Sequence, residues 1–289
     1  MEHVLQFRES YDQKPQPYAG EPTVFTTQVM IAGVNCYWFT PEDPSPDRII
    51  IYIHGGGFAA GSIRTHGNMV SYFAKELHAE TLFIEYALAP ENPYPAGLND
   101  ILTVYRELAN RYPGYQIDLI GDSAGGSLVI STIGEILKLR LPLPDAVVLI
   151  SPWVSLECDN PSMEENAQID RTLNKGMLQL FARAYTGGVS LEVSGPKKAS
   201  LIQFPPVLIM VGTNEILLDD SKYFYNDIKG IQGKSKLSIY DDQPRGASVN
   251  GLPVSPLRRL SKMEWRPYLA FSTSRRSEAA RLKVSWRLS

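Results

Sequence analysis

The chain is poor in the residues that would point to a disulfide-rich or metal-binding protein, since it has 2 cysteines and 4 histidines in 289 residues. Cys36 and Cys158 lie far apart, and without a secretory signal we expect free thiols rather than a bridge. No group of residues has the spacing of metal ligands. We therefore expect no metal site.

Long apolar runs are also absent, which excludes a membrane-spanning helix on the sequence alone. Residues 1–10 lack the basic and apolar regions of a secretory signal, so the sequence predicts a cytoplasmic protein. Hydrophobic residues nevertheless make up 44% of the chain, enough for one large domain with a full core.

Short apolar runs bounded by Gly, Pro or charged residues recur along the chain, separated by segments of helical length. They lie at 49–53, 82–86, 117–120, 146–150 and 207–211. Such runs suit parallel strands buried on both faces, so the alternation predicts a doubly wound α/β domain. Residues 23–31 and 34–39 predict an antiparallel hairpin at the sheet edge, and 158–200 reads as helices and loops suited to a cap.

The run Gly121-Asp122-Ser123-Ala124-Gly125 follows an apolar stretch and precedes a helical pattern, and it fits the G-x-S-x-G nucleophile elbow. Glycines beside the serine permit a cramped strand-to-helix turn that exposes its hydroxyl above the sheet. The alternative is a glycine-rich turn without chemistry. The pattern makes Ser123 a candidate nucleophile.

A second glycine motif, His54-Gly55-Gly56-Gly57, follows the apolar run 49–53 and matches the HGGG loop of oxyanion holes. Consecutive glycines let backbone N–H groups approach a developing oxyanion without side chains in the way. A tight hairpin or a phosphate loop would be the alternative. No Lys-Ser/Thr follows, however, and there is no G-x-G-x-x-G with a downstream acid, so the oxyanion interpretation is favoured.

With these two motifs the chain resembles the hormone-sensitive-lipase-like carboxylesterases of the α/β-hydrolase family over about residues 24–244. Further matching motifs are 86–91 (YALAPE), 94–96 (YPA), 151–153 (SPW) and 212–219 (GTNEILLD). The resemblance implies an α/β-hydrolase fold with a mostly parallel eight-stranded sheet flanked by helices and a small helical cap. It also implies hydrolysis of short acyl esters without a cofactor, with the N–H groups of Gly56, Gly57 and Ala124 forming the oxyanion hole.

The triad acid of this fold comes after the serine and before the histidine. Glu215 follows the last strong apolar run and occupies the position where the family has its acid, so we expect it to orient a histidine. The alternative makes Asp219 the acid and Glu215 a charge near a helix N-terminus.

No histidine follows this acid, because the four histidines are His3, His54, His66 and His78. The stretch 238–244 resembles the approach to the family's histidine, yet the next residue is Arg245, which stays protonated and cannot accept the serine proton. The resemblance implies that His54 shapes the glycine loop. His66 and His78 are interpreted as surface or helix histidines, and His3 as part of a mobile terminus.

The charge of the chain changes abruptly at the same position. Residues 245–289 contain ten Lys and Arg against two Glu, a net +8, and since the whole chain is −3, residues 1–244 carry −11. We interpret 245–289 as an aberrant basic tail, frame-shifted or disordered. The alternative is a genuine tail that binds something acidic. The remaining units are a short N-terminal cap segment at 1–22 and the hydrolase core at 23–244, with a cap insertion at about 158–200.

The sequence therefore predicts a serine esterase for small-molecule, short-chain acyl esters, impaired by the loss of its base. The alternative is a protein that binds a small ligand without turnover, as in the plant gibberellin receptor, which resembles this family and has lost the catalytic histidine. We expect no nucleic-acid partner and no membrane span, and a homodimer stays open.

Overall fold

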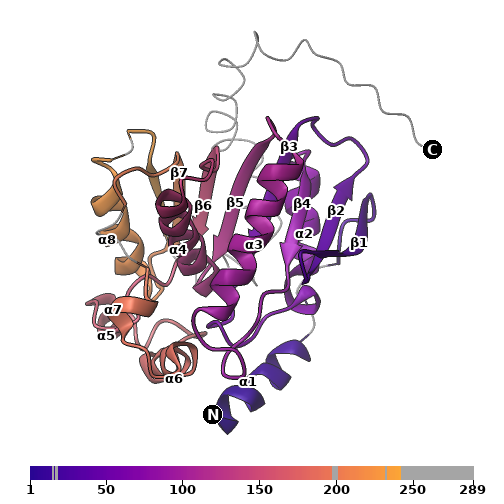
Figure 1. The fold of residues 1–289 in the computed structure, drawn as a ribbon. Helices are drawn as coiled ribbons and strands as arrows, with labels where there is room; N and C mark the ends of the chain where they lie inside the picture. Colours follow the sequence, from indigo (N-terminus) through magenta and orange to yellow (C-terminus); the bar gives the residue numbers. More distant parts are fainter. Residues whose placement is uncertain (15, 17–18, 197–200, 232, 242–289) are drawn as a thin grey trace, which may run out of the picture.

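The structure is a computed structural model that describes residues 1–14, 16, 19–196, 201–231 and 233–241. Its strands are β1 (Val24–Ile31), β2 (Val34–Pro41), β3 (Arg48–Ile53), β4 (Glu80–Ile84), β5 (Gln116–Asp122), β6 (Ala146–Ile150), β7 (Val207–Gly212) and β8 (Lys236–Tyr240). Its helices are α1 (Glu2–Asp12), α2 (Ile63–Glu76), α3 (Ala96–Arg111), α4 (Ala124–Leu139), α5 (Ser162–Glu165), α6 (Lys175–Thr186), α7 (Leu191–Ser194) and α8 (Leu218–Ile228). Figure 1 shows the sheet with helices packed against it.

The eight strands form one sheet in the order β1-β2-β4-β3-β5-β6-β7-β8. The pairs β1·β2 and β2·β4 are antiparallel and the other five are parallel, which confirms the predicted mostly parallel α/β sheet. The predicted edge hairpin is also confirmed. Its turn residues Ala32 and Gly33 both have positive φ, as a two-residue hairpin turn requires.

Two apolar cores lie on the two faces of the sheet, and β3 contributes to both. Ile49, Ile51 and Ile53 pack in the larger core with helices α3, α4 and α8, while Ile50 and Tyr52 pack in the smaller core with α2. This alternation follows from the two-residue period of a strand. The strand predicted from the apolar run 82–86 instead spans Glu80–Ile84. It begins earlier because its first residue is charged and does not belong to the apolar run.

Helix α1 and the cap-region helices α5, α6 and α7 lie at one end of the molecule (Figure 1). The segment 158–196 is helical and irregular, while residues 197–200 and the tail 245–289 lie outside the described part of the chain, so the division into core, cap and tail stays a prediction. Both cysteines are buried free thiols, as expected. Within the described residues, every helix is too short or too polar to cross a membrane.

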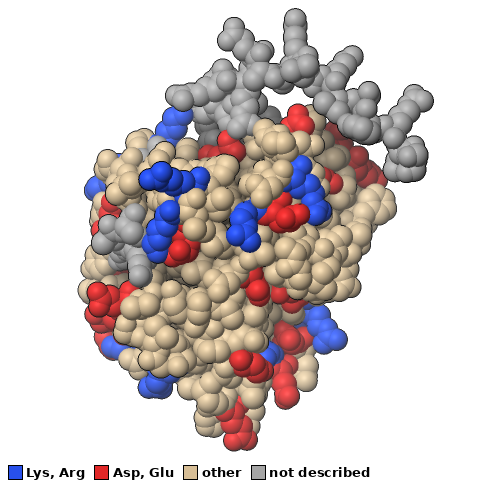
Figure 2. Space-filling model, viewed as in Figure 1, with Lys and Arg blue, Asp and Glu red and all other residues tan. Residues whose placement is uncertain are grey.

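Basic and acidic side chains are interspersed on the face of the molecule in Figure 2. Acidic residues extend from the region of the sheet to the end where α1 lies. The sign of the charge therefore does not set one region of this visible face apart from the others.

Candidate active site

Ser123 lies between the end of β5 and the start of α4 with φ of 52° and ψ of −120°. A positive φ is uncommon for a residue with a side chain and is held only where the surroundings fix it. Here the Ser123 N–H donates to the Ile150 carbonyl at 2.9 Å, and its carbonyl accepts from the Trp153 N–H at 3.0 Å. Strand β6 and the loop after it thus hold the turn on which the candidate nucleophile lies.

Gly125 shows why this turn needs glycine. A Cβ placed on Gly125 would lie 2.1 Å from the Ile53 carbonyl oxygen and 2.6 Å from that of His54. These are backbone atoms at the end of β3 and cannot move aside cheaply. The elbow therefore packs directly against the strand that leads into the glycine loop.

The glycine loop at 55–57 begins where β3 ends, next to the elbow. Strands β3 and β5 are parallel neighbours, with Ile53 opposite Gly121, so both motifs emerge from the same edge of the sheet. Gly56 has φ of 115°, which a residue with a Cβ rarely adopts, and its carbonyl accepts from the Ala60 N–H at 2.9 Å. The structure thus brings Gly56 and Gly57 to the same edge as Ser123 and Ala124.

Glu215 lies in the turn between β7 and α8 and is 1% exposed. Its Oε1 accepts the Gly212 N–H at 2.7 Å. Asn166 of the cap region supports this turn, since its Nδ2 donates to the carbonyl of Thr213 at 3.0 Å and to that of Glu215 at 2.8 Å. Glu215 is therefore held in the interior by both the core and the cap region.

Asp219, the alternative acid, is committed to a different set of contacts. Its Oδ2 accepts the Ser162 N–H at 2.8 Å, and its Oδ1 lies 3.3 Å from Lys222 Nζ. These contacts attach the first turn of α8 to α5. The carboxylate of Asp219 therefore has a different backbone partner from the Gly212 N–H that Glu215 accepts.

His54 is buried beside the glycine loop, stacked between Phe83 and Tyr86 at centroid distances of 5.2 and 4.2 Å. Its Nδ1 lies 2.8 Å from the Gly55 carbonyl oxygen. Burial, reinforced by the neighbouring His66, lowers the pKa of His54 to about 3, against the opposing effects of Gly55 and Asp122. The imidazole is therefore neutral at physiological pH and packs within the loop.

His66 lies in helix α2, one of the two expected places, but it is fully buried and not at the surface. Its Nδ1 lies 2.7 Å from Thr65 Oγ1, and its Nε2 lies 3.8 Å from Asp122 Oδ2. His78 follows α2 and His3 lies in α1, and both are exposed. Sequence reasoning did not reveal the burial of His66, because a polar residue on the inner face of an amphipathic helix carries no signal of its buried partner.

Arg245 lies outside the described residues, so the structure does not place the position at which the histidine is missing. The chain can be followed to the end of β8 and Asp241. There the Tyr240 carbonyl accepts the Thr213 N–H at 3.0 Å. The strand that leads toward Arg245 thus ends beside the turn of Glu215.

Helices α1 and α6 cover the glycine loop through contacts that the sequence motifs did not reveal. Arg8 Nε donates to the Ala59 carbonyl at 2.6 Å, and its guanidinium pairs with Glu91 at 2.7 Å. Phe181 of α6 packs edge to face on Phe7 at 5.0 Å and would contact any Cβ on Gly57. The N-terminal helix and the cap region therefore share one cover over the loop.

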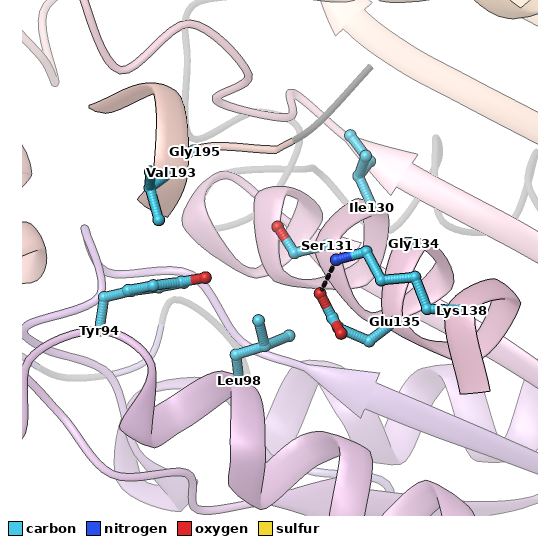
Figure 3. Close-up of a pocket in the computed structure, with 9 residues that line it drawn as sticks. All are labelled: Tyr94, Leu98, Ile130, Ser131, Gly134, Glu135, Lys138, Val193 and Gly195. Carbon is cyan, nitrogen blue, oxygen red and sulfur yellow. Dashed lines mark hydrogen bonds and ion pairs between the residues drawn. The ribbon is translucent and has the colours of Figure 1, made fainter. Parts of the chain in front are cut away.

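A separate hollow of about 300 Å³, open solvent included, lies between α3, α4 and α7 (Figure 3). Its lining includes Tyr94, Leu98, Ser131 and the ion-paired Glu135 and Lys138. Ser131 is eight residues beyond Ser123 on α4, roughly 12 Å along the helix axis. This hollow is therefore distinct from the edge of the sheet where the two glycine motifs meet.

Comparison with known proteins agrees with this geometry. A family described as alpha/beta hydrolase fold matches residues 50–248. An acetyl-hydrolase of Streptomyces hygroscopicus is 30% identical over 218 residues, which cover 74% of this chain and 73% of that protein.

Two solved structures are similar over nearly the whole chain. An esterase from the bacterial hormone-sensitive lipase family has a TM-score of 0.79 and 29% identity, covering 90% of this chain and 94% of its own. The esterase EstE5, soaked by p-nitrophenyl butyrate, has a TM-score of 0.84 and 30% identity, covering 92% of each chain.

Proposed function

Because this chain belongs to the hormone-sensitive-lipase-like carboxylesterases of the α/β-hydrolase family, we propose that it hydrolyses short-chain acyl esters through Ser123, with activity impaired by the absence of the triad histidine. The observation that carries the proposal is the meeting of the Ser123 elbow with the glycine loop at one edge of the sheet. That arrangement suits attack on a carbonyl whose oxygen is received by backbone N–H groups.

In the proposed reaction the Ser123 hydroxyl attacks the ester carbonyl carbon, and the carbonyl oxygen becomes the oxyanion. The N–H groups of Gly56, Gly57 and Ala124 stabilise that charge. The alcohol leaves with a proton, and water then releases the acid from the acyl-serine. In an intact triad the acid at the position of Glu215 would orient a histidine that removes and returns the protons, and this chain has no histidine for that role.

The chain has no histidine beyond residue 78, and Arg245 stands where the resemblance places the base. Arginine remains protonated at neutral pH and cannot take the proton from Ser123. In other serine hydrolases the oxyanion hole and binding alone leave roughly 10³- to 10⁴-fold acceleration over water. We expect residual turnover of that order.

A second candidate function is binding of a small ligand without turnover, and it is favoured by the same missing histidine. A binding protein of this kind would keep the pocket while losing the base. The altered charge of the whole segment 245–289 instead favours damage to an esterase over repurposing. Tight binding of one small acid, without turnover, would support the binding protein.

The test is hydrolysis of p-nitrophenyl acetate and butyrate by the unaltered chain, Ser123→Ala and Arg245→His. The butyrate ester is suited because EstE5 was soaked by it. We expect weak hydrolysis by the unaltered chain and a remainder of similar size in Ser123→Ala, because the oxyanion hole and binding act without the nucleophile. If Arg245→His is no faster than the unaltered chain, the segment beyond 245 is needed as well. Rapid Ser123-dependent turnover by the unaltered chain would contradict the missing-base argument.

A further inference from the structure

Asp122 is the variable residue of the G-x-S-x-G pattern, and the structure gives it contacts that the pattern does not specify. It is 3% exposed at the end of β5. Its Oδ1 accepts the Gly55 N–H at 2.9 Å and the Tyr52 hydroxyl at 2.7 Å. One carboxylate oxygen thus receives two donors from the end of β3 and the start of the glycine loop.

These contacts join the two halves of the proposed oxyanion hole. Asp122 is covalently next to Ser123, and its partner Gly55 is covalently next to Gly56. The donors of such a site must be held to within a fraction of an ångström of the position that the oxyanion occupies. The hydrogen bond between Asp122 and Gly55 is a direct connection between the elbow and the loop.

The charge of Asp122 is compensated inside the protein. Burial raises the pKa of Asp122, but His66, Tyr52 and Gly55 together outweigh burial, so the pKa lies below its usual range. The carboxylate is therefore ionised at neutral pH. Hydrogen bonds to an ionised acceptor are shorter and stronger than those between neutral groups, which suits a fixed connection.

The packing of Gly55 is a second, independent observation. A Cβ on Gly55 would lie 2.2 Å from Asp122 Oδ2 and 2.9 Å from the Asp122 carbonyl oxygen. Only glycine lets the loop lie this close to the carboxylate. The first glycine of the loop is thus required for its contact with Asp122.

We propose that Asp122 is a positioning residue, whose carboxylate fixes the N–H groups of Gly56 and Gly57 relative to Ser123 by holding Gly55. This inference rests on the proposed function. It gives a role to Asp122, whose position the G-x-S-x-G pattern leaves open. Asp122 acts through Gly55. It takes no part in bond making itself.

The experiment compares two ligands of the same shape, 1,1,1-trifluoro-4-phenylbutan-2-one and 4-phenylbutan-2-one. Addition of Ser123 to the trifluoromethyl ketone forms a C–O bond and converts the carbonyl oxygen into an oxyanion, while the serine proton passes to solvent. The methyl ketone binds without this step. The ratio of the two dissociation constants therefore measures oxyanion stabilisation separately from pocket binding.

We expect Asp122→Ala to lower this ratio by about 10- to 100-fold, since a misplaced donor loses about that much. Asp122→Asn keeps an acceptor oxygen for Gly55 and should stay within about threefold of the unaltered chain. Tyr52→Phe removes the other donor to the same oxygen and is the matched control, also expected within about threefold. An unchanged ratio in Asp122→Ala, or an equal loss in Asp122→Asn, would overturn the proposal.

Amide hydrogen exchange tests the connection without chemistry. Gly55 lies outside the strands, so slow exchange of its N–H in the unaltered chain depends on Asp122. Exchange at the rate of an open amide would overturn the inference even if Asp122→Ala does not fold. If the unaltered chain binds both ketones equally, the proposed function fails, and the Gly55 exchange rate still decides whether Asp122 holds the loop.

Discussion

The buried imidazole of His54 makes the stability of this protein depend on pH in a way that one substitution should remove. His54 is fully buried and stacked between Phe83 and Tyr86. The substitution His54→Phe keeps an aromatic ring in this position and abolishes the titration. Tyr86→Phe is the matched control, because it removes only the hydrogen bond from Tyr86 to the His54 carbonyl, 2.7 Å long.

The magnitude follows from the two protonation equilibria. An unfolded histidine takes up its proton near pH 6.5, whereas burial lowers the pKa of His54 in the folded chain to about 3. Between these values the unfolded state binds more protons, so stability is fully present above pH 6.5 and falls as the pH falls. Linkage gives a loss of about 2 kcal/mol from His54 between pH 8 and pH 5.

The assay is urea unfolding at pH 8 and at pH 5 for the three proteins. His54→Phe should lose about 2 kcal/mol less than the unaltered chain over this interval, and Tyr86→Phe should lose as much as the unaltered chain. Burial also raises the pKa of Asp118 to about 6, so that residue gains stability as the pH falls. This opposing contribution is common to all three proteins and cancels in the comparison. Equal losses in His54→Phe and the unaltered chain would refute the reasoning.

Substitutions at three further positions test the framework around the loop. Gly125→Ala places a Cβ against the Ile53 carbonyl, and urea unfolding should show a loss of at least about 2 kcal/mol; a neutral result would contradict the close packing. Arg8→Ala removes charged hydrogen bonds to Ala59 and Glu91, so thermal unfolding should reveal a loss of about 2 kcal/mol in the free energy of unfolding. Arg8→Lys should lose most of the same amount, because lysine cannot reproduce the bidentate contact with Glu91. Phe181→Ala empties a buried site beside Gly57 and should cost about 3 kcal/mol, with faster amide exchange in the loop; unchanged exchange would separate α6 from the loop.

The sequence predicts the strands and the two glycine motifs because each is determined by a local pattern. A buried parallel strand such as β6 needs an unbroken apolar run. The elbow needs glycine at position 125, because its backbone there lies against the end of the neighbouring strand β3. Asp122 could not be recognised in this way, since the pattern accepts any residue at its position. Its partners Tyr52 and Gly55 lie 70 and 67 residues away, and only the pairing of β3 with β5 brings them together.

The same distinction explains the contacts that sequence reasoning missed. His66 is separated from Asp122 by 56 positions, so its burial follows from how α2 packs on the sheet. Arg8 contacts Ala59 across 51 positions and Glu91 across 83. Neither contact leaves a periodic signal in the chain. Local patterns thus locate the backbone of the candidate site, whereas tertiary packing selects the side chains that hold it.

The contacts around Ser123 and Glu215 bear on whether the chain is a damaged esterase or a binding protein. The positive φ of Ser123 and the close glycine packing of the loop are backbone constraints that persist only where the surroundings fix them. Binding of a ligand requires a pocket but no strained serine. Retention of the strained elbow beside the glycine loop therefore favours an architecture built for acyl transfer, with the departure confined to the segment from Arg245 onward.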